Sequence, residues 1–261
     1  MSGNSLSGRH ALVCGASSGI GRASALALAA EGAALTVLAR RADRLETLLD
    51  ELKSAGAPSA QALVLSLDDR EQLASTMDAL LERGPVHIVV HNTGGPPGGT
   101  LASVSEAELI HYFGRHVASA QLLVQKTLPG MVAASYGRFI QIVSTSVREP
   151  IPGLGLSNII RAAMGGWAKS WSQELPPGVT INSVLPGFTD TERLGTLVEA
   201  RAVQQGRSSE EILDGFCSQV PEGRIARPEE PAALVAFLAS PAAGYLRGTA
   251  IAVDGGRMRS I

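Results

Sequence analysis

Short apolar runs and longer amphipathic stretches alternate along this chain of 261 residues. The apolar runs are rich in β-branched residues, which is typical of strands that a sheet buries on both faces. We expect strands over the ranges 10–14, 34–39, 62–67, 87–91, 139–143, 179–185 and 250–253. The stretches between them predict helices over 20–31, 42–54, 70–82, 105–133, 158–175 and 228–238.

This alternation predicts the fold class. Strands separated by helices form a parallel sheet, and right-handed crossovers place the helices on both of its faces. We therefore predict a single α/β domain over residues 1–261, with a doubly wound, seven-stranded parallel sheet of the Rossmann type. Ligands of such sheets bind over the carboxyl ends of the strands.

One helical segment interrupts the alternation between Gly187 and Pro221. Ser208 and Glu211 have the spacing of a capping box, so we expect a short helix to begin there. Long insertions at the carboxyl edge of a sheet often form lids. We interpret residues 188–221 as a lid over the substrate, and the alternative is a structural helical pair packed on the sheet edge.

Composition narrows the function classes. The net charge of −2 gives no reason to expect a nucleic acid or an anionic membrane as partner. No apolar run approaches the roughly 20 residues that span a bilayer, and residues 1–9 lack the apolar core of a signal peptide. The two cysteines, Cys14 and Cys217, do not suggest a disulfide framework. We expect a cytoplasmic protein with a small-molecule substrate and no metal site.

A glycine-rich turn follows the first predicted strand and precedes a helix. Gly15, Gly19 and Gly21 let the backbone approach a pyrophosphate, and the N–H groups and dipole of the helix N-terminus favour that anion. The turn therefore predicts a bound dinucleotide, and the alternative is a glycine-rich turn without a ligand. The expected contacts are Gly15, Ser17, Ser18, Gly19, Ile20 and Gly21.

Further motifs follow the later strands in order. They are Asn92-Thr93-Gly94-Gly95, then Pro186-Gly187 with Thr191, and finally Val253-Asp254-Gly255-Gly256. With the glycine spacing, they make the chain resemble the short-chain dehydrogenase/reductase family, in particular members like 3-oxoacyl-carrier-protein reductases, from about Gly8 to Gly256. The resemblance implies an NAD(P)-dependent oxidoreductase that assembles as a homotetramer or homodimer. It also implies cofactor contacts from Asn92, Gly94, Arg161, Pro186, Gly187, Thr189 and Thr191.

The residues after the second strand indicate which dinucleotide binds. Ala39 ends that strand without the carboxylate that holds the ribose hydroxyls of NAD, and Arg40 and Arg41 follow. Because a guanidinium is well shaped to bind a 2′-phosphate, we predict NADP(H) rather than NAD(H), with Arg40 as the main contact. The alternative is that both arginines are a solvated helix start. The family resemblance places Ser66 and Leu67 against the adenine.

The resemblance fails at the catalytic positions. The family uses a Tyr-x-x-x-Lys pair, a serine thirteen residues before the tyrosine, and an asparagine on an earlier helix. Here Ser144 matches the serine, but Ser157 and Arg161 stand at the tyrosine and lysine positions, and His116 stands at the asparagine position. Arg161 keeps a cation, whereas Ser157 is a far weaker acid than a phenol.

His116 is the nearest residue whose unperturbed pKa, about 6.5, lies close to neutrality. We therefore predict a carbonyl–alcohol oxidoreductase with a rebuilt proton donor, in which His116 protonates the product directly or through water. The alternative for His116 is a packing role. The alternatives for the protein are an NADP(H)-binding sensor, partner subunit or scaffold without turnover, or an enzyme of cofactor-assisted dehydration or epimerisation.

Two loops and two tryptophans complete the predictions. The glycine- and proline-rich segments 94–99 and 150–155 are expected to form opposite walls of the cleft, or else ordinary surface turns. Trp167 and Trp171 lie on the predicted helix 158–175, where they pack either against another subunit or in the core.

Overall fold

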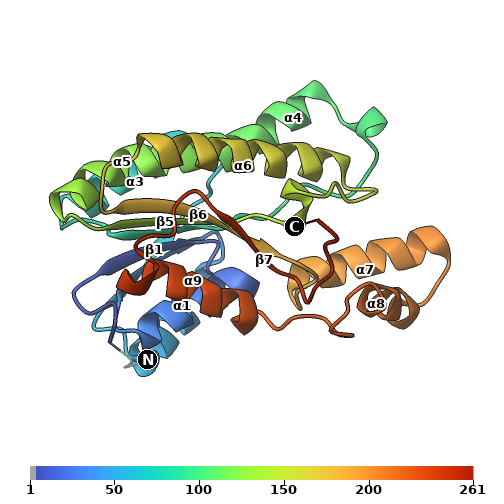
Figure 1. Cartoon of the computed structure of the whole chain (residues 1–261), viewed down its shortest axis with the longest axis horizontal. Coiled ribbons are helices and arrows are strands. Elements are labelled where there is room, and N and C mark those ends of the chain that lie inside the picture. Colours follow the sequence, from blue (N-terminus) through green and yellow to red (C-terminus); the bar gives the residue numbers. More distant parts are fainter. Residues whose placement is uncertain (1–3, 261) are drawn as a thin grey trace.

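Seven parallel strands form one sheet in the order β3-β2-β1-β4-β5-β6-β7 (Figure 1). The computed structural model describes residues 4–260, so residues 1–3 and 261 of the predicted domain lie outside the described part. The predicted doubly wound parallel sheet is confirmed. Its strands are β1 (His10–Cys14), β2 (Ala34–Ala39), β3 (Ala60–Val64), β4 (Ile88–His91), β5 (Gly137–Ile142), β6 (Val179–Pro186) and β7 (Ala250–Val253).

Helices cover both faces of the sheet. On one face lie α3 (Arg70–Leu81), α4 (Glu106–Phe113), α5 (Ser119–Ala133) and α6 (Gly155–Glu174) (Figure 1). On the other face α1 (Gly19–Ala30) packs between α2 (Ala42–Ala55) and α9 (Glu229–Ala239). Strand residues alternate between the two layers: Ala11 and Val13 of β1 belong to one buried cluster, and Leu12 and Cys14 belong to the other.

The predicted helix over 105–133 is interrupted. A five-residue π-helical segment, Gly114–Ala118, separates α4 from α5. The Ser119 hydroxyl donates to the carbonyl oxygens of Arg115 and His116, which satisfies backbone acceptors of the widened turn. Segments of this kind often occur at functional sites, and this one carries His116 into the interior.

Several predicted boundaries were wrong, two of them by three residues. Strand β3 ends at Val64 rather than Leu67, because its partner β2 ends at Ala39, the residue that pairs with Val64. Leu65 and Leu67 are buried after the strand has ended. Helix α6 begins at Gly155, three residues earlier than predicted.

The segment between β6 and α9 contains two helices, α7 (Glu192–Gln205) and α8 (Ser209–Cys217), which extend beyond the sheet (Figure 1). The predicted capping box is present, since the Ser208 side chain accepts from the Glu211 backbone and the Glu211 side chain from the Ser208 backbone. The Phe188 ring stacks on Phe216 with centroids 4.4 Å apart, so aromatic packing fixes α8 to the start of this segment.

The contacts of the two tryptophans favour packing in the core over packing against another subunit. Trp167 and Trp171 are partly buried against the core cluster, and both indole N–H groups donate to Oε1 of Gln121, at 2.8 and 2.9 Å. Their polar atoms are therefore satisfied within the chain.

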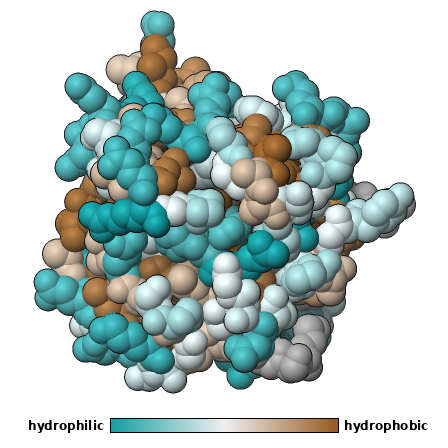
Figure 2. All heavy atoms as spheres, turned by 90° about the vertical axis from the view of Figure 1, so that its left-hand side faces the viewer, coloured by the Kyte–Doolittle hydropathy of each residue, from teal (hydrophilic) through white to brown (hydrophobic). Residues whose placement is uncertain are grey.

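The end of the molecule away from α7 and α8 is mostly hydrophilic, with small scattered hydrophobic groups (Figure 2). Within residues 4–260, no helix combines the length and the apolar character needed to cross a membrane.

Candidate functional site

A cavity of about 530 Å³ opens over the carboxyl ends of the strands. Its walls come from the loops after β1, β2, β3, β4, β5 and β6 and from helices α6 and α7. Most of the predicted site residues line it. They are Gly15, Ser17, Ser18, Gly19, Ile20, Arg40, Arg41, Ser66, Leu67, Asn92, Gly94, Ser144, Ser157, Arg161, Pro186, Gly187, Thr189 and Thr191.

The backbone conformation and the packing of the glycine turn disfavour any side chain at its three glycine positions. Gly15 and Gly19 have φ values of +62° and +55°, a conformation that residues with a Cβ rarely adopt. Gly21 is absent from the cavity wall, and it has a packing role. A Cβ there would lie 2.6 Å from Nδ2 of Asn92, whose amide donates to the Gly15 carbonyl oxygen at 3.2 Å. Asn92 therefore ties the loop after β4 to the turn after β1.

The two arginines after β2 differ in their contacts. Arg41 donates to the hydroxyl oxygens of Ser17 and Ser18, at 2.7 Å for the shortest of these bonds, and pairs with Glu192 of α7 at 2.8 Å. Arg40 is exposed and lines the cavity, and its side chain has no hydrogen-bond or ion-pair partner in the described chain. Of these two arginines, Arg40 is therefore the one whose guanidinium N–H groups are available to a ligand.

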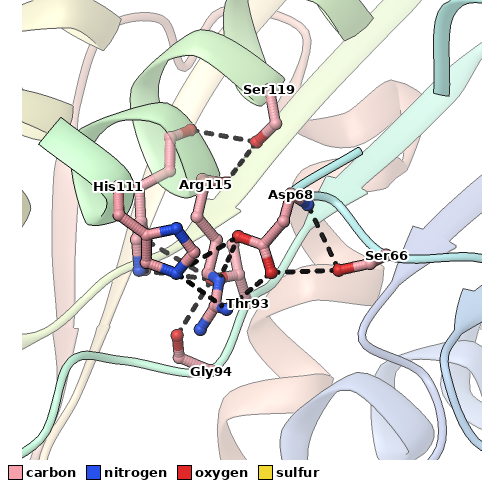
Figure 3. A network of polar contacts seen from close by, with 8 residues as sticks. Ser66, Asp68, Thr93, Gly94, His111, Arg115 and Ser119 are labelled. Atoms are coloured by element: carbon pink, nitrogen blue, oxygen red, sulfur yellow. Dashed lines mark hydrogen bonds and ion pairs between the residues drawn. The ribbon is translucent and has the colours of Figure 1, made fainter. Parts of the chain in front are cut away.

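A polar network follows β3 (Figure 3). Arg115 donates to both carboxylate oxygens of Asp68, at 2.7 and 2.5 Å, and the Ser66 hydroxyl donates to Asp68 at 3.0 Å. The Arg115 guanidinium is the main reason that the pKa of the Asp68 carboxyl is lowered. Sequence reasoning missed Asp68 and Arg115, because their 47-residue separation leaves no signal in the local pattern.

The residues at the serine, tyrosine and lysine positions of the family lie at the end of β5 and on α6, and all three line the cavity. Ser144 follows β5, and its Oγ accepts from the backbone N–H of Ser146 at 3.1 Å. Ser157 and Arg161 lie one turn apart on α6, and both are buried. The Ser157 hydroxyl has no hydrogen-bond partner within residues 4–260, so it is free to bind a ligand.

Arg161 is a buried cation, and no carboxylate among residues 4–260 forms an ion pair with it. It donates to the Ile142 carbonyl oxygen at 3.0 Å, and its Nε has no partner among the described residues. Burial, and then repulsion from Arg193, lowers the pKa of Arg161 to about 10, so the guanidinium remains charged at neutral pH. Such a group favours a ligand that offers acceptor atoms.

His116 lies behind the cavity wall. Its ring contacts the hydroxyl of Thr93, with Nε2 3.3 Å from Oγ1, and Thr93 lines the cavity. Burial, followed by the charges of Arg161 and His91, lowers the pKa of His116 to about 2. The ring is therefore neutral near pH 7, and the imidazolium form that an acid catalyst requires is strongly disfavoured.

The two glycine- and proline-rich loops are joined rather than opposed. The backbone N–H of Gly99 donates to the Gly153 carbonyl oxygen at 2.8 Å, and Gly99 and Leu154 form a parallel bridge. The prediction of opposite walls is wrong, because backbone pairing between the loops places them on the same side. Gly94, Gly95, Ile151 and Leu154 contribute to the cavity.

Two further arginines line the cavity and were absent from the sequence predictions. Arg193 of α7 donates to the Pro96 carbonyl oxygen. Arg257 lies in the loop after β7, with its guanidinium carbon 4.5 Å from the centre of the Phe188 ring. No motif marks either residue, so only the tertiary structure brings them to the site.

Comparisons with known proteins agree with this geometry. A family model described as Enoyl-(Acyl carrier protein) reductase matches residues 15–257. The chain is 34% identical to the 3-oxoacyl-[acyl-carrier-protein] reductase FabG of Pseudomonas aeruginosa, over 98% of this chain and 100% of that protein. It is 33% identical to the oxidoreductase YvrD of Bacillus subtilis, over 96% of each chain. The structure of L-sorbose reductase from Gluconobacter frateurii, complexed with NADPH and L-sorbose, is similar with a TM-score of 0.93, 27% identity and full coverage of both chains.

Proposed function

The chain belongs to the short-chain dehydrogenase/reductase family, and we propose that it is an NADP(H)-dependent oxidoreductase interconverting a carbonyl and an alcohol on a small to medium organic substrate. The observation that carries the proposal is the meeting of the glycine turn with Ser144, Ser157 and Arg161 in one cavity. Similar proteins described as binding NADPH, such as the sorbose reductase, support the choice of cofactor.

The described residues fit this cofactor. Gly15 and Gly19 line the cavity, so a pyrophosphate bound there can lie against the backbone of the turn. Arg40, with its free guanidinium, suits the 2′-phosphate, whereas Arg41 already binds Ser17, Ser18 and Glu192. Ser66, Leu67, Asn92, Gly94, Pro186, Gly187, Thr189 and Thr191 complete the proposed contacts.

The nicotinamide supplies or accepts the hydride when the cofactor is bound. Ser144 and Ser157 offer hydroxyl groups to the substrate oxygen, and Arg161 adds a positive charge that stabilises negative charge developing there. The product alkoxide still needs a proton. Because His116 is neutral, we propose that this proton comes from solvent through the serine hydroxyls, and that His116 orients the Thr93 hydroxyl.

A second candidate is an NADP(H)-binding protein without turnover. Ser157 and Arg161 stand where the family resemblance places the tyrosine and lysine, and no tyrosine of the described chain lines the cavity. The protein then acts as a sensor, a partner subunit or a scaffold. Both candidates require NADPH binding, so binding alone does not separate them.

One experiment separates the two candidates. NADPH binding is measured by fluorescence titration, and NADPH consumption is then followed with a panel of ketones, aldehydes and oxo acids. Consumption above the rate without enzyme, lost in Ser144→Ala, supports the oxidoreductase. Tight binding with no consumption for any carbonyl supports the second candidate, and absence of NADPH binding contradicts both.

The organisation of the chain supports three related proposals. We propose one domain with residues 188–221 as its lid, since Leu194 and Leu197 of α7 line the cavity and α7 carries the Glu192 partner of Arg41.

We propose a homotetramer or homodimer, since Ile110 and Phe113 are exposed on α4, and light scattering tests this. A cytoplasmic location accords with two free cysteines.

A further inference from the structure

The cavity carries more positive than negative charge. Six arginines line it (Arg40, Arg41, Arg115, Arg161, Arg193 and Arg257), against two carboxylates, Asp68 and Glu192. Both carboxylates are already paired, Asp68 with Arg115 and Glu192 with Arg41. Of the other four arginines, none has a carboxylate oxygen within 4.0 Å in residues 4–260.

The arginines without a carboxylate partner in residues 4–260 lie in two different parts of the cavity. Arg40 follows β2, next to the glycine turn, and suits the cofactor phosphates. Arg257 follows β7 at the opposite edge of the sheet. Five strand spacings separate β2 from β7, which is roughly 24 Å at the usual distance between strands. The charge of Arg257 is therefore not explained by the 2′-phosphate that we assign to Arg40.

Arg257 lies beside the proposed carbonyl site. One terminal nitrogen lies 3.3 Å from the Thr145 hydroxyl, and Thr145 directly follows Ser144. The guanidinium packs over the Phe188 ring, which stacks in turn on Phe216 of α8. This packing holds the group in place at the cavity wall, and its Nε is buried without a partner in the described chain.

Arg193 lines the same cavity from α7, next to Arg161. Its guanidinium lies 3.9 Å from where a Cβ on Gly95 would be, and that of Arg161 lies 3.2 Å from the same point. Two guanidinium groups close together without a carboxylate repel each other. This pair therefore adds to the preference of the cavity as a whole for an anionic ligand.

From the contacts of Arg257 we infer that the substrate is an oxo acid or a hydroxy acid, and that Arg257 binds its carboxylate. This inference rests on the proposed function for the position of the reacting carbonyl. A planar carboxylate fits the guanidinium fork of Arg257, and contacts with the Phe188 ring and the Thr145 hydroxyl fix the position of that fork.

The test compares acids with their uncharged esters on the NADP⁺-loaded protein. Acetoacetate and 2-oxobutyrate are each titrated beside their methyl esters by calorimetry, with inorganic phosphate as a third probe. The variants are Arg257→Gln and the matched control Arg259→Gln, which removes the same charge from the same loop at an exposed residue outside the cavity wall.

We expect an acid to bind the wild type at least tenfold more tightly than its ester. We expect Arg257→Gln to weaken acid binding about 10- to 100-fold, the usual worth of a charge-assisted hydrogen bond, and to leave NADPH binding unchanged. Arg259→Gln should bind the acid as the wild type does.

Three results overturn the inference: equal binding of acid and ester, no effect of Arg257→Gln, or binding of phosphate but of neither acid. The proposed function fails separately. If the acid binds through Arg257 but no carbonyl compound is turned over, the anion site stands and the oxidoreductase does not. If esters are reduced as well as acids in both the wild type and Arg257→Gln, the oxidoreductase stands and the anion site does not.

Discussion

Nε2 of His116 lies 3.3 Å from the hydroxyl oxygen of Thr93, and it is Thr93 that lines the cavity. This relationship changes the role expected for the histidine. A ring with a pKa of about 2 does not carry a proton to a product near pH 7. The contact instead lets a neutral imidazole fix the direction of a hydroxyl group at the cavity wall.

The buried histidines make the stability of the protein sensitive to acid. The folded pKa of His116 lies below its ordinary value of 6.5, so between pH 6.5 and about 2 the unfolded chain binds a proton that the folded chain does not. The free energy of unfolding therefore falls as the pH drops through this window. His91, whose pKa burial lowers to about 3, acts in the same direction.

For His116 we expect a loss of about 2 kcal/mol between pH 6.5 and pH 5, from about 1.4 kcal/mol per pH unit. Urea unfolding at the two pH values measures it. In His116→Gln, which cannot be protonated, the difference between the two pH values should shrink by about that amount. An unchanged difference would show that the ring is protonated in the folded state.

Replacement of Gly21 by alanine should disrupt the dinucleotide turn. The added Cβ would overlap the Gly15 carbonyl oxygen and would lie 2.6 Å from Nδ2 of Asn92, so the backbone of the turn itself must shift. We expect a loss of about 1–3 kcal/mol in the free energy of unfolding, together with weaker NADPH binding. Gly166→Ala on α6 is the control, since a Cβ there meets no atom within 4 Å, and it should stabilise the protein by about 0.5–1 kcal/mol.

Removal of the Arg40 guanidinium should change the cofactor preference. We expect Arg40→Ala to weaken NADPH binding about 10- to 100-fold and to change NADH binding little, because only NADPH carries the 2′-phosphate. Arg44→Ala is the control, since it removes a nearby arginine that does not line the cavity. Equal losses for both cofactors in Arg40→Ala would contradict the assignment.

Restoring a phenol should raise turnover if the cavity retains the geometry of the family. We expect the double variant Ser157→Tyr with Arg161→Lys to increase kcat by about 10²- to 10⁴-fold over the wild type, the usual contribution of general acid catalysis. Ser157→Phe with Arg161→Lys supplies the same ring without the hydroxyl and should show no increase. Steady-state kinetics with a carbonyl that the wild type reduces measures both. Activity in the double variant alone would favour the second candidate function for the natural protein.

Local patterns were sufficient for much of the fold. Apolar runs gave β1, β2 and β7 with their observed bounds, because a buried parallel strand needs continuous apolar residues. The Ser208–Glu211 spacing located the start of α8, since a capping box is a contact between residues three apart. The π-helical segment around His116 escaped prediction, because its carbonyl groups are satisfied by a side chain in the following turn.

The sequence by itself determined the glycine turn, the serines and arginine at the catalytic positions, and the alternation that winds the sheet, because each depends on residues close together in the chain. Only the tertiary structure decided that His116 is buried and neutral, that Arg41 reaches Ser18, and that Arg257 lies beside Thr145. The Arg257–Thr145 contact joins residues 112 positions apart. Burial and charge at such a site are sums over neighbours that the fold brings together, and no local pattern records them.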